Sequence, residues 1–236
     1  LPVLPASLVD SACEILESAR PLLADAILAD LYTNPFWKNR FDEYGRGYAR
    51  IDIQYHLNYL ITALRSDSRN IYPDYWVKYR LVMVQRGACT HHVQEFIACT
   101  ARQVGLVLRE AFPLAEPHFA AAHRGLEYDL PACRALSAQR EAIIERVTHK
   151  VSPQDDERIL TRRDMRYHLS YLEDATALER PELFTQYVQW VRQFLMEFGL
   201  RPAGLTGALQ ALDEALTQML PAESASVFTA VLRSVV

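Results

Sequence analysis

Glycine is scarce in this chain: only 8 of the 236 residues are glycine, well below the usual share of about 7%. A fold that depends on many tight turns and positive φ angles is therefore not expected. Strict alternation of apolar and polar residues over a strand length is also rare, whereas apolar residues recur at spacings of three and four. These features predict an all-α fold.

Long apolar runs and an excess of positive charge are missing as well. No run approaches the roughly 18 apolar residues that span a bilayer, and residues 1–5 lack the basic and long apolar regions of a secretory signal. We therefore expect a cytoplasmic protein that does not bind membranes. The net charge of −4 provides no electrostatic attraction to nucleic acid, so no nucleic-acid partner is expected.

Motifs that would identify an enzyme are absent. The sequence has no phosphate-binding glycine loop, no Gly-x-Ser-x-Gly, no zinc-protease helix and no Glu-x-x-His of a di-iron bundle. His91, His92 and Glu95 are metal-ligand types, but they are typical of a solvated helix start. The spacing leaves a nucleophilic Cys–His pair open, although each cysteine has apolar neighbours that favour inert burial. The four cysteines, none in a Cys-x-x-Cys spacing, predict reduced thiols: Cys13, Cys89, Cys99 and Cys133.

An internal repeat is the clearest pattern that is present. When the chain is aligned with itself so that position 56 meets position 168, the pattern Asp-x-x-x-His-Leu-x-Tyr-Leu at 52–60 meets the same pattern at 164–172. In this register, ten of the 36 positions from 52 to 87 are identical without a gap. We interpret this as a duplication. It predicts two tandem bundles of about four main helices each, over residues 1–113 and 131–236, joined by a connector at 114–130.

The repeated motif supplies the first candidate site residues. On a helix, an aspartate four residues before a histidine can hydrogen-bond the imidazole, fix its tautomer and favour its protonated form. The group is then either a buried polar clasp between helices or a histidine held to contact a metal or cofactor. The two sets are Asp52, His56 and Tyr59, and Asp164, His168 and Tyr171.

The third helix of the first bundle is richer in aromatic residues than its counterpart. Tyr75, Trp76 and Tyr79 align with Tyr187, Val188 and Val191. Such a stripe is usually core, but its hydroxyl groups are also typical of an apolar pocket with a few polar handles. If either bundle binds a ligand, we expect the first. The candidate ligand residues are His56, Tyr59, Tyr75, Trp76, Tyr79 and His168.

Residues 164–216 contain Tyr-His-Leu-x-Tyr-Leu, then Pro-Glu-Leu-Phe-Thr-Gln-Tyr-Val-Gln-Trp-Val and a leucine-spaced helix. This stretch resembles globin-like helical sensor modules of bacterial regulatory proteins, including the non-haem globin sensors of stressosomes and bilin- or cobalamin-associated proteins. The resemblance implies globin-like bundles and a tetrapyrrole as a candidate cofactor. It does not imply haem, because no proximal-histidine pattern can be placed.

The leading hypothesis is therefore a non-enzymatic sensory or small-ligand-binding protein, with a small molecule, a protein or a second copy of the chain as partner. One alternative is a structural or interaction module that binds no ligand. Another is a metal- or cofactor-dependent enzyme that uses His56 or His168.

Overall fold

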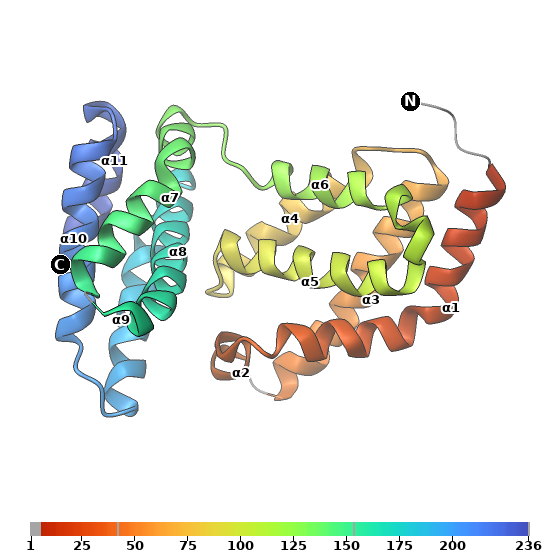
Figure 1. Ribbon diagram of the computed structural model, residues 1–236, viewed down its shortest axis with the longest axis horizontal. Helices are drawn as coiled ribbons and strands as arrows, with labels where there is room; N and C mark the ends of the chain where they lie inside the picture. Colours follow the sequence, from red (N-terminus) through yellow and green to blue (C-terminus); the bar gives the residue numbers. More distant parts are fainter. Residues whose placement is uncertain (1–5, 42, 153, 236) are drawn as a thin grey trace. The chain divides into compact units, whose positions relative to one another are not determined.

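The computed structural model describes residues 6–41, 43–152 and 154–235; the segment 1–5 lies outside them. The predicted all-α class is confirmed: within these ranges there are eleven α-helices, one 3-10 helix and no strand. In chain order the elements are α1 (Ala6–Leu31), α2 (Pro35–Arg40), α3 (Glu43–Arg65), α4 (Ile71–Gln85), α5 (Thr90–Leu108), η1 (Arg109–Leu114), α6 (Glu116–Gly125), α7 (Pro131–Val151), α8 (Asp155–Ala177), α9 (Glu182–Glu197), α10 (Ala203–Met219) and α11 (Ala222–Arg233) (Figure 1).

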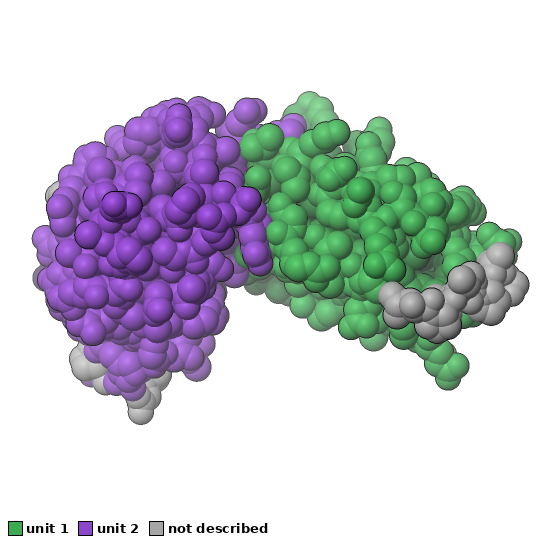
Figure 2. Space-filling model, turned by 90° about the horizontal axis from the view of Figure 1, so that it is seen from above, with its two compact units in different colours: residues 1–81, 93–126 green, residues 82–92, 127–236 purple. Residues whose placement is uncertain are grey.

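The contacts within the chain divide it into two compact units (Figure 2). Unit 1 comprises residues 1–81 and 93–126, and unit 2 comprises residues 82–92 and 127–236. The stretch 114–130, which the sequence suggested as a connector, contains α6. No helix in the described ranges is both long and apolar enough to cross a membrane.

In unit 1, α1 packs along α3 (Figure 1). Arg65 pairs with Glu17, and Arg50 pairs with Asp25, so two ion pairs flank the apolar contact between these helices. The apolar spacing of both helices places one face of each in the core, where the fully buried residues include Leu16, Leu23, Ile27, Ile53, Leu57 and Leu60. Burial of these side chains supplies most of the stabilisation that holds the two helices together.

In unit 2, α7 contacts α8, α10 and α11, and α8 also contacts α9 and α11. Their apolar faces form one continuous core. Its fully buried members include Leu136, Ile143, Val147, Leu169, Leu172, Leu209, Leu212, Leu216, Phe228 and Leu232.

Four helices, α3, α4, α8 and α9, end in the same way. The second residue after each helix has a positive φ between 47° and 86°. The following N–H then donates to the carbonyl five residues back, at 2.8 to 3.0 Å. This closure satisfies carbonyl groups that a helix end leaves open. The four positive-φ residues are Asp67, Gly87, Glu179 and Gly199.

Candidate functional site

Five of the predicted ligand residues meet in unit 1. His56, on α3, is fully buried, and its Nδ1 lies 2.7 Å from the hydroxyl oxygen of Tyr75 on α4. The imidazole stacks on Trp76 at 4.3 Å between ring centroids and meets the edge of Tyr79 at 4.7 Å. Tyr59, which is partly exposed, stacks on Tyr75 at 4.0 Å. The five residues therefore form one aromatic cluster between α3 and α4.

The same arrangement recurs in unit 2. His168 on α8 is buried, and its Nδ1 lies 2.7 Å from the hydroxyl oxygen of Tyr187 on α9. Tyr171 stacks on Tyr187 at 3.6 Å. In both units the histidine and the tyrosine are 19 residues apart. We call each of these histidine–tyrosine hydrogen bonds a clasp, because it joins two successive helices.

The prediction that Asp52 hydrogen-bonds His56 and that Asp164 hydrogen-bonds His168 is wrong. Asp52 accepts a hydrogen bond from Tyr79 at 3.3 Å, and Asp164 pairs with Arg163. The expected protonated ring is also wrong, because burial lowers the pKa of His56 to about 3 and that of His168 to about 4. The physical reason is that each imidazole is surrounded by aromatic and apolar groups, which cannot stabilise a positive charge.

Unit 1 differs from unit 2 around its clasp. Nε2 of His56 is buried and has no hydrogen-bond partner among the described residues. Trp76, which packs on that ring and is fully buried, has Val188 at the aligned position in unit 2. This unpaired Nε2 of His56 therefore lies in the first bundle, which the sequence favoured for binding a ligand.

A second polar cluster, in unit 2, was not found from the sequence. The carboxylate of Asp174 on α8 is buried and accepts hydrogen bonds from the N–H of Thr90 (2.7 Å), from the Thr90 hydroxyl (2.5 Å) and from the hydroxyl of Tyr128 (2.7 Å). Burial raises the pKa of Asp174 to about 6, and these hydrogen bonds oppose that rise. The Oγ of Ser170 accepts from the N–H of His91 at 2.9 Å. Two α8 side chains thus cap the first turn of α5.

The Cys–His pair that spacing left open is Cys89 and His92. The thiol sulfur lies 3.1 Å from Nδ1 of His92, which also accepts the Cys89 N–H at 3.2 Å. Both residues are buried; burial raises the pKa of the thiol and lowers the pKa of the imidazole well below its usual value. A neutral pair closed to solvent supports packing rather than nucleophilic chemistry. The described residues hold no group of three potential metal ligands.

Four exposed tyrosines and one exposed isoleucine form a face on α3 that was not predicted from the sequence. Their spacings of four, three, four and four residues place them in one stripe, and their exposed fractions run from 40% to 73%. We call this stripe the α3 tyrosine face. It consists of Tyr44, Tyr48, Ile51, Tyr55 and Tyr59.

The aligned tyrosines of unit 2 are covered. Tyr167 and Tyr171 are 8% and 4% exposed. The ring of His92 stacks on Tyr167 at 4.5 Å, and the hydroxyl of Tyr171 donates to the carbonyl of Gly87 at 2.8 Å. Residues 82–92 therefore cover in unit 2 a surface that is exposed on α3.

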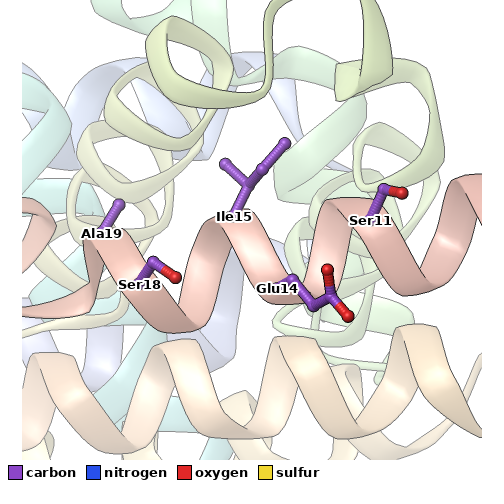
Figure 3. Close-up of a pocket in the computed structure, with 5 residues that line it drawn as sticks. All are labelled: Ser11, Glu14, Ile15, Ser18 and Ala19. Carbon is purple, nitrogen blue, oxygen red and sulfur yellow. The ribbon is translucent and has the colours of Figure 1, made fainter.

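A surface hollow lies elsewhere, along α1. It is lined by Ser11, Glu14, Ile15, Ser18 and Ala19 (Figure 3). None of the predicted ligand residues lines it. Comparison of the chain with known protein families, with curated proteins and with solved structures finds no match.

The clasps should be measurable as stability. Tyr187→Phe leaves the buried Nδ1 of His168 without its partner and should lower the free energy of unfolding by about 1–3 kcal/mol. Tyr75→Phe should act similarly in unit 1. Tyr55→Phe, at a position that is 55% exposed, is the control and should change it by less than about 0.5 kcal/mol. Urea unfolding checks this, and equal losses for Tyr187→Phe and Tyr55→Phe would contradict the clasp.

The buried histidines should also make stability depend on pH. A histidine in the unfolded chain has a pKa of about 6.5, above the folded values of about 3 and about 4. Between these limits the unfolded chain binds more protons, so stability is present above pH 6.5 and is lost as the pH falls. Each histidine should remove about 2 kcal/mol between pH 7 and pH 5.

Asp174 changes the stability with pH in the direction opposite to the histidines, so the parent chain alone does not show the effect of His56. Comparison with His56→Gln isolates that effect. The raised pKa of Asp174 stabilises the fold as the pH falls through about 6. In urea unfolding at pH 7, 6 and 5, His56→Gln should lose less stability than the parent chain on going from pH 7 to pH 5. Identical pH dependence in the two proteins would show that His56 is not held neutral.

Proposed function

We propose that this chain is a non-enzymatic protein-interaction module, built from two copies of one helical unit, that binds a protein segment through the α3 tyrosine face. The exposure of that face carries the proposal. Four of its five side chains are tyrosines, which are enriched at protein interfaces because they combine a large apolar ring with a polar tip. Contiguous exposed apolar patches of this kind mark interaction sites.

Several observations support the duplication. In the register that aligns position 56 with position 168, helices α3 and α8 begin at matching positions and end at matching positions, and the ends of α4 and α9 match as well. The positive-φ residues after these helices, and the residues of the two clasps, fall at matching positions of the same register. Descent of both units from one ancestral unit explains all of these matching positions.

The covered surface in unit 2 supports an interaction role for its exposed counterpart. Tyr167 and Tyr171 pack under a helix end, a turn and a helix start, residues 82–92. Tyr55 and Tyr59 are the aligned residues of α3, and they are 55% and 40% exposed. A surface that accepts a helical turn in one unit is therefore suited to accept one in the other.

The chemistry of the buried groups favours this function over an enzyme. His56 and His168 are held neutral by burial, and each already shares a hydrogen bond with a tyrosine. Cys89 and His92 are closed to solvent. Catalytic acids, bases and nucleophiles need access to substrate and a pKa near the working pH, and these four residues lack both.

Site-specific photo-crosslinking tests the proposed function. A photoreactive phenylalanine at Tyr55 of the full chain, in cells that naturally make it, should form adducts with a protein partner. Tyr48→Asp on the same face should abolish those adducts. The same label at Leu106, which is 69% exposed on α5, is the control. Adducts that form equally at both positions, or that persist with Tyr48→Asp, would rule out the α3 tyrosine face as the site.

A globin-like sensor that binds a small ligand, with a tetrapyrrole as the candidate, is a second proposal. The observation in its favour is the buried Nε2 of His56 without a partner, since such atoms in native proteins call for a bound group or a water. This proposal predicts that freshly purified protein releases a small molecule on denaturation, seen by its absorption and by mass spectrometry. Colourless protein of the bare chain mass, 27.0 kDa, would argue against it.

A further inference from the structure

The packing of residues 82–92 on α8 provides a template for an interaction. The Tyr171 hydroxyl donates to the Gly87 carbonyl, and the Asp174 carboxylate accepts the N–H and hydroxyl of Thr90. Val84 and Ala88, on either side of the turn, are only 3% and 1% exposed. The template thus consists of a tyrosine-bearing helix face and a helix–turn–helix segment that covers it.

The helix face and the covering segment of this template each have an aligned counterpart elsewhere in the chain. Both counterparts are exposed. The helix face is the α3 tyrosine face, with Tyr59 aligned to Tyr171. The segment is residues 194–204, with Gly199 (φ 70°) aligned to Gly87 (φ 86°). Its apolar side chains Met196, Phe198 and Leu200 are 60%, 63% and 56% exposed.

We propose that residues 194–204 of one chain dock on the α3 tyrosine face of a second copy, so that the protein associates head to tail. This inference rests on the proposed function and names its partner. The Tyr59 hydroxyl of one copy donates to the Gly199 carbonyl of the other, as Tyr171 does to Gly87 within the chain. Met196 and Leu200, which align with the buried Val84 and Ala88 of the template, bury their side chains against the tyrosine rings.

The polar residues of the two exposed halves match each other. Thr90 supplies the N–H and hydroxyl that Asp174 accepts; the aligned residues are Pro202, which has no N–H, and Thr62, which has no carboxylate. Donor and carboxylate are therefore both replaced, which avoids a buried charge without a partner.

A second hydrogen bond of the template can be kept. Ser170 accepts the N–H of His91 at 2.9 Å. The aligned residues are Asn58, whose side chain has an acceptor oxygen, and Ala203, which still has its N–H. The second pair of surfaces thus retains partners for the hydrogen bonds of Tyr171 and Ser170, and it lacks both groups of the two hydrogen bonds between Thr90 and Asp174.

Two variants of the full chain test head-to-tail association. Leu200→Asp, at the position aligned with the buried Ala88, damages the segment and leaves α3 intact, whereas Tyr55→Asp damages α3 and leaves the segment intact. Both positions are exposed, so neither change should unfold the protein. Each variant alone should raise the Kd of self-association by about 30-fold or more, as loss of a central interface residue does. An equimolar mixture should form a 1:1 complex, because one good contact remains.

Sedimentation velocity with light scattering measures this. The parent chain and the exposed control variant Leu106→Asp should associate to multiples of 27.0 kDa, while the two interface variants stay at the single-chain mass until they are mixed. A parent chain that stays monomeric at high concentration, or two variants that fail to associate on mixing, overturns the second-copy proposal. If crosslinking at Tyr55 then captures a different protein and Tyr48→Asp abolishes the adduct, the proposed function stands and only this partner is wrong.

Discussion

The clasp between a buried histidine and a tyrosine of the next helix is the contact around which each unit is arranged. Burial excludes water from the imidazole, so its one hydrogen bond must come from a residue that packing brings close. That requirement fixes the facing sides of α3 and α4 through His56 and Tyr75, and of α8 and α9 through His168 and Tyr187. The face of the histidine helix turned away from the core is then left for other contacts: residues 82–92 cover Tyr167 and Tyr171 of α8, whereas Tyr55 of α3 is exposed.

The helices and the residues of the aromatic cluster could be predicted from the sequence, because both depend on local spacing. Apolar residues three and four apart define a buried face; the repeated motif pointed to His56, and the aromatic stripe of the third helix pointed to Tyr75, Trp76 and Tyr79. The partner of His56 could not be predicted in the same way. The i, i+4 rule considers only residues of one helix and selected Asp52, whereas the structure selects Tyr75, 19 residues away, because the burial of the ring excludes a charged form.

Contacts between distant segments explain what the sequence left undetected. Thr90 and Asp174 are 84 residues apart, and no local pattern connects a helix start with a carboxylate on another helix. The exposure of the α3 tyrosine face is a similar case, since Tyr55 and Tyr59 are exposed on α3 whereas the aligned Tyr167 and Tyr171 are covered on α8. A periodic pattern shows which residues share a face, but only the packing of other segments decides whether that face is covered. For Cys89 and His92 a local signal did exist, in their spacing of three residues at a helix start.

The duplication that we propose, followed by divergence, explains why similar motifs have different surroundings in the two units. The clasp residues are the same in both units, because a buried imidazole tolerates few partners. Around them, Trp76 aligns with Val188, and Asp174 aligns with Thr62. Asp174 is costly to bury, as its raised pKa indicates, and it is present where Thr90 and Tyr128 satisfy it. In unit 1 the residue aligned with Asp174 is Thr62. In the proposed contact between two copies it faces Pro202, which has no N–H to donate to a carboxylate. The distribution of these polar groups therefore follows the donors available to each surface, which is the condition that an interface must meet before its apolar residues can stabilise it.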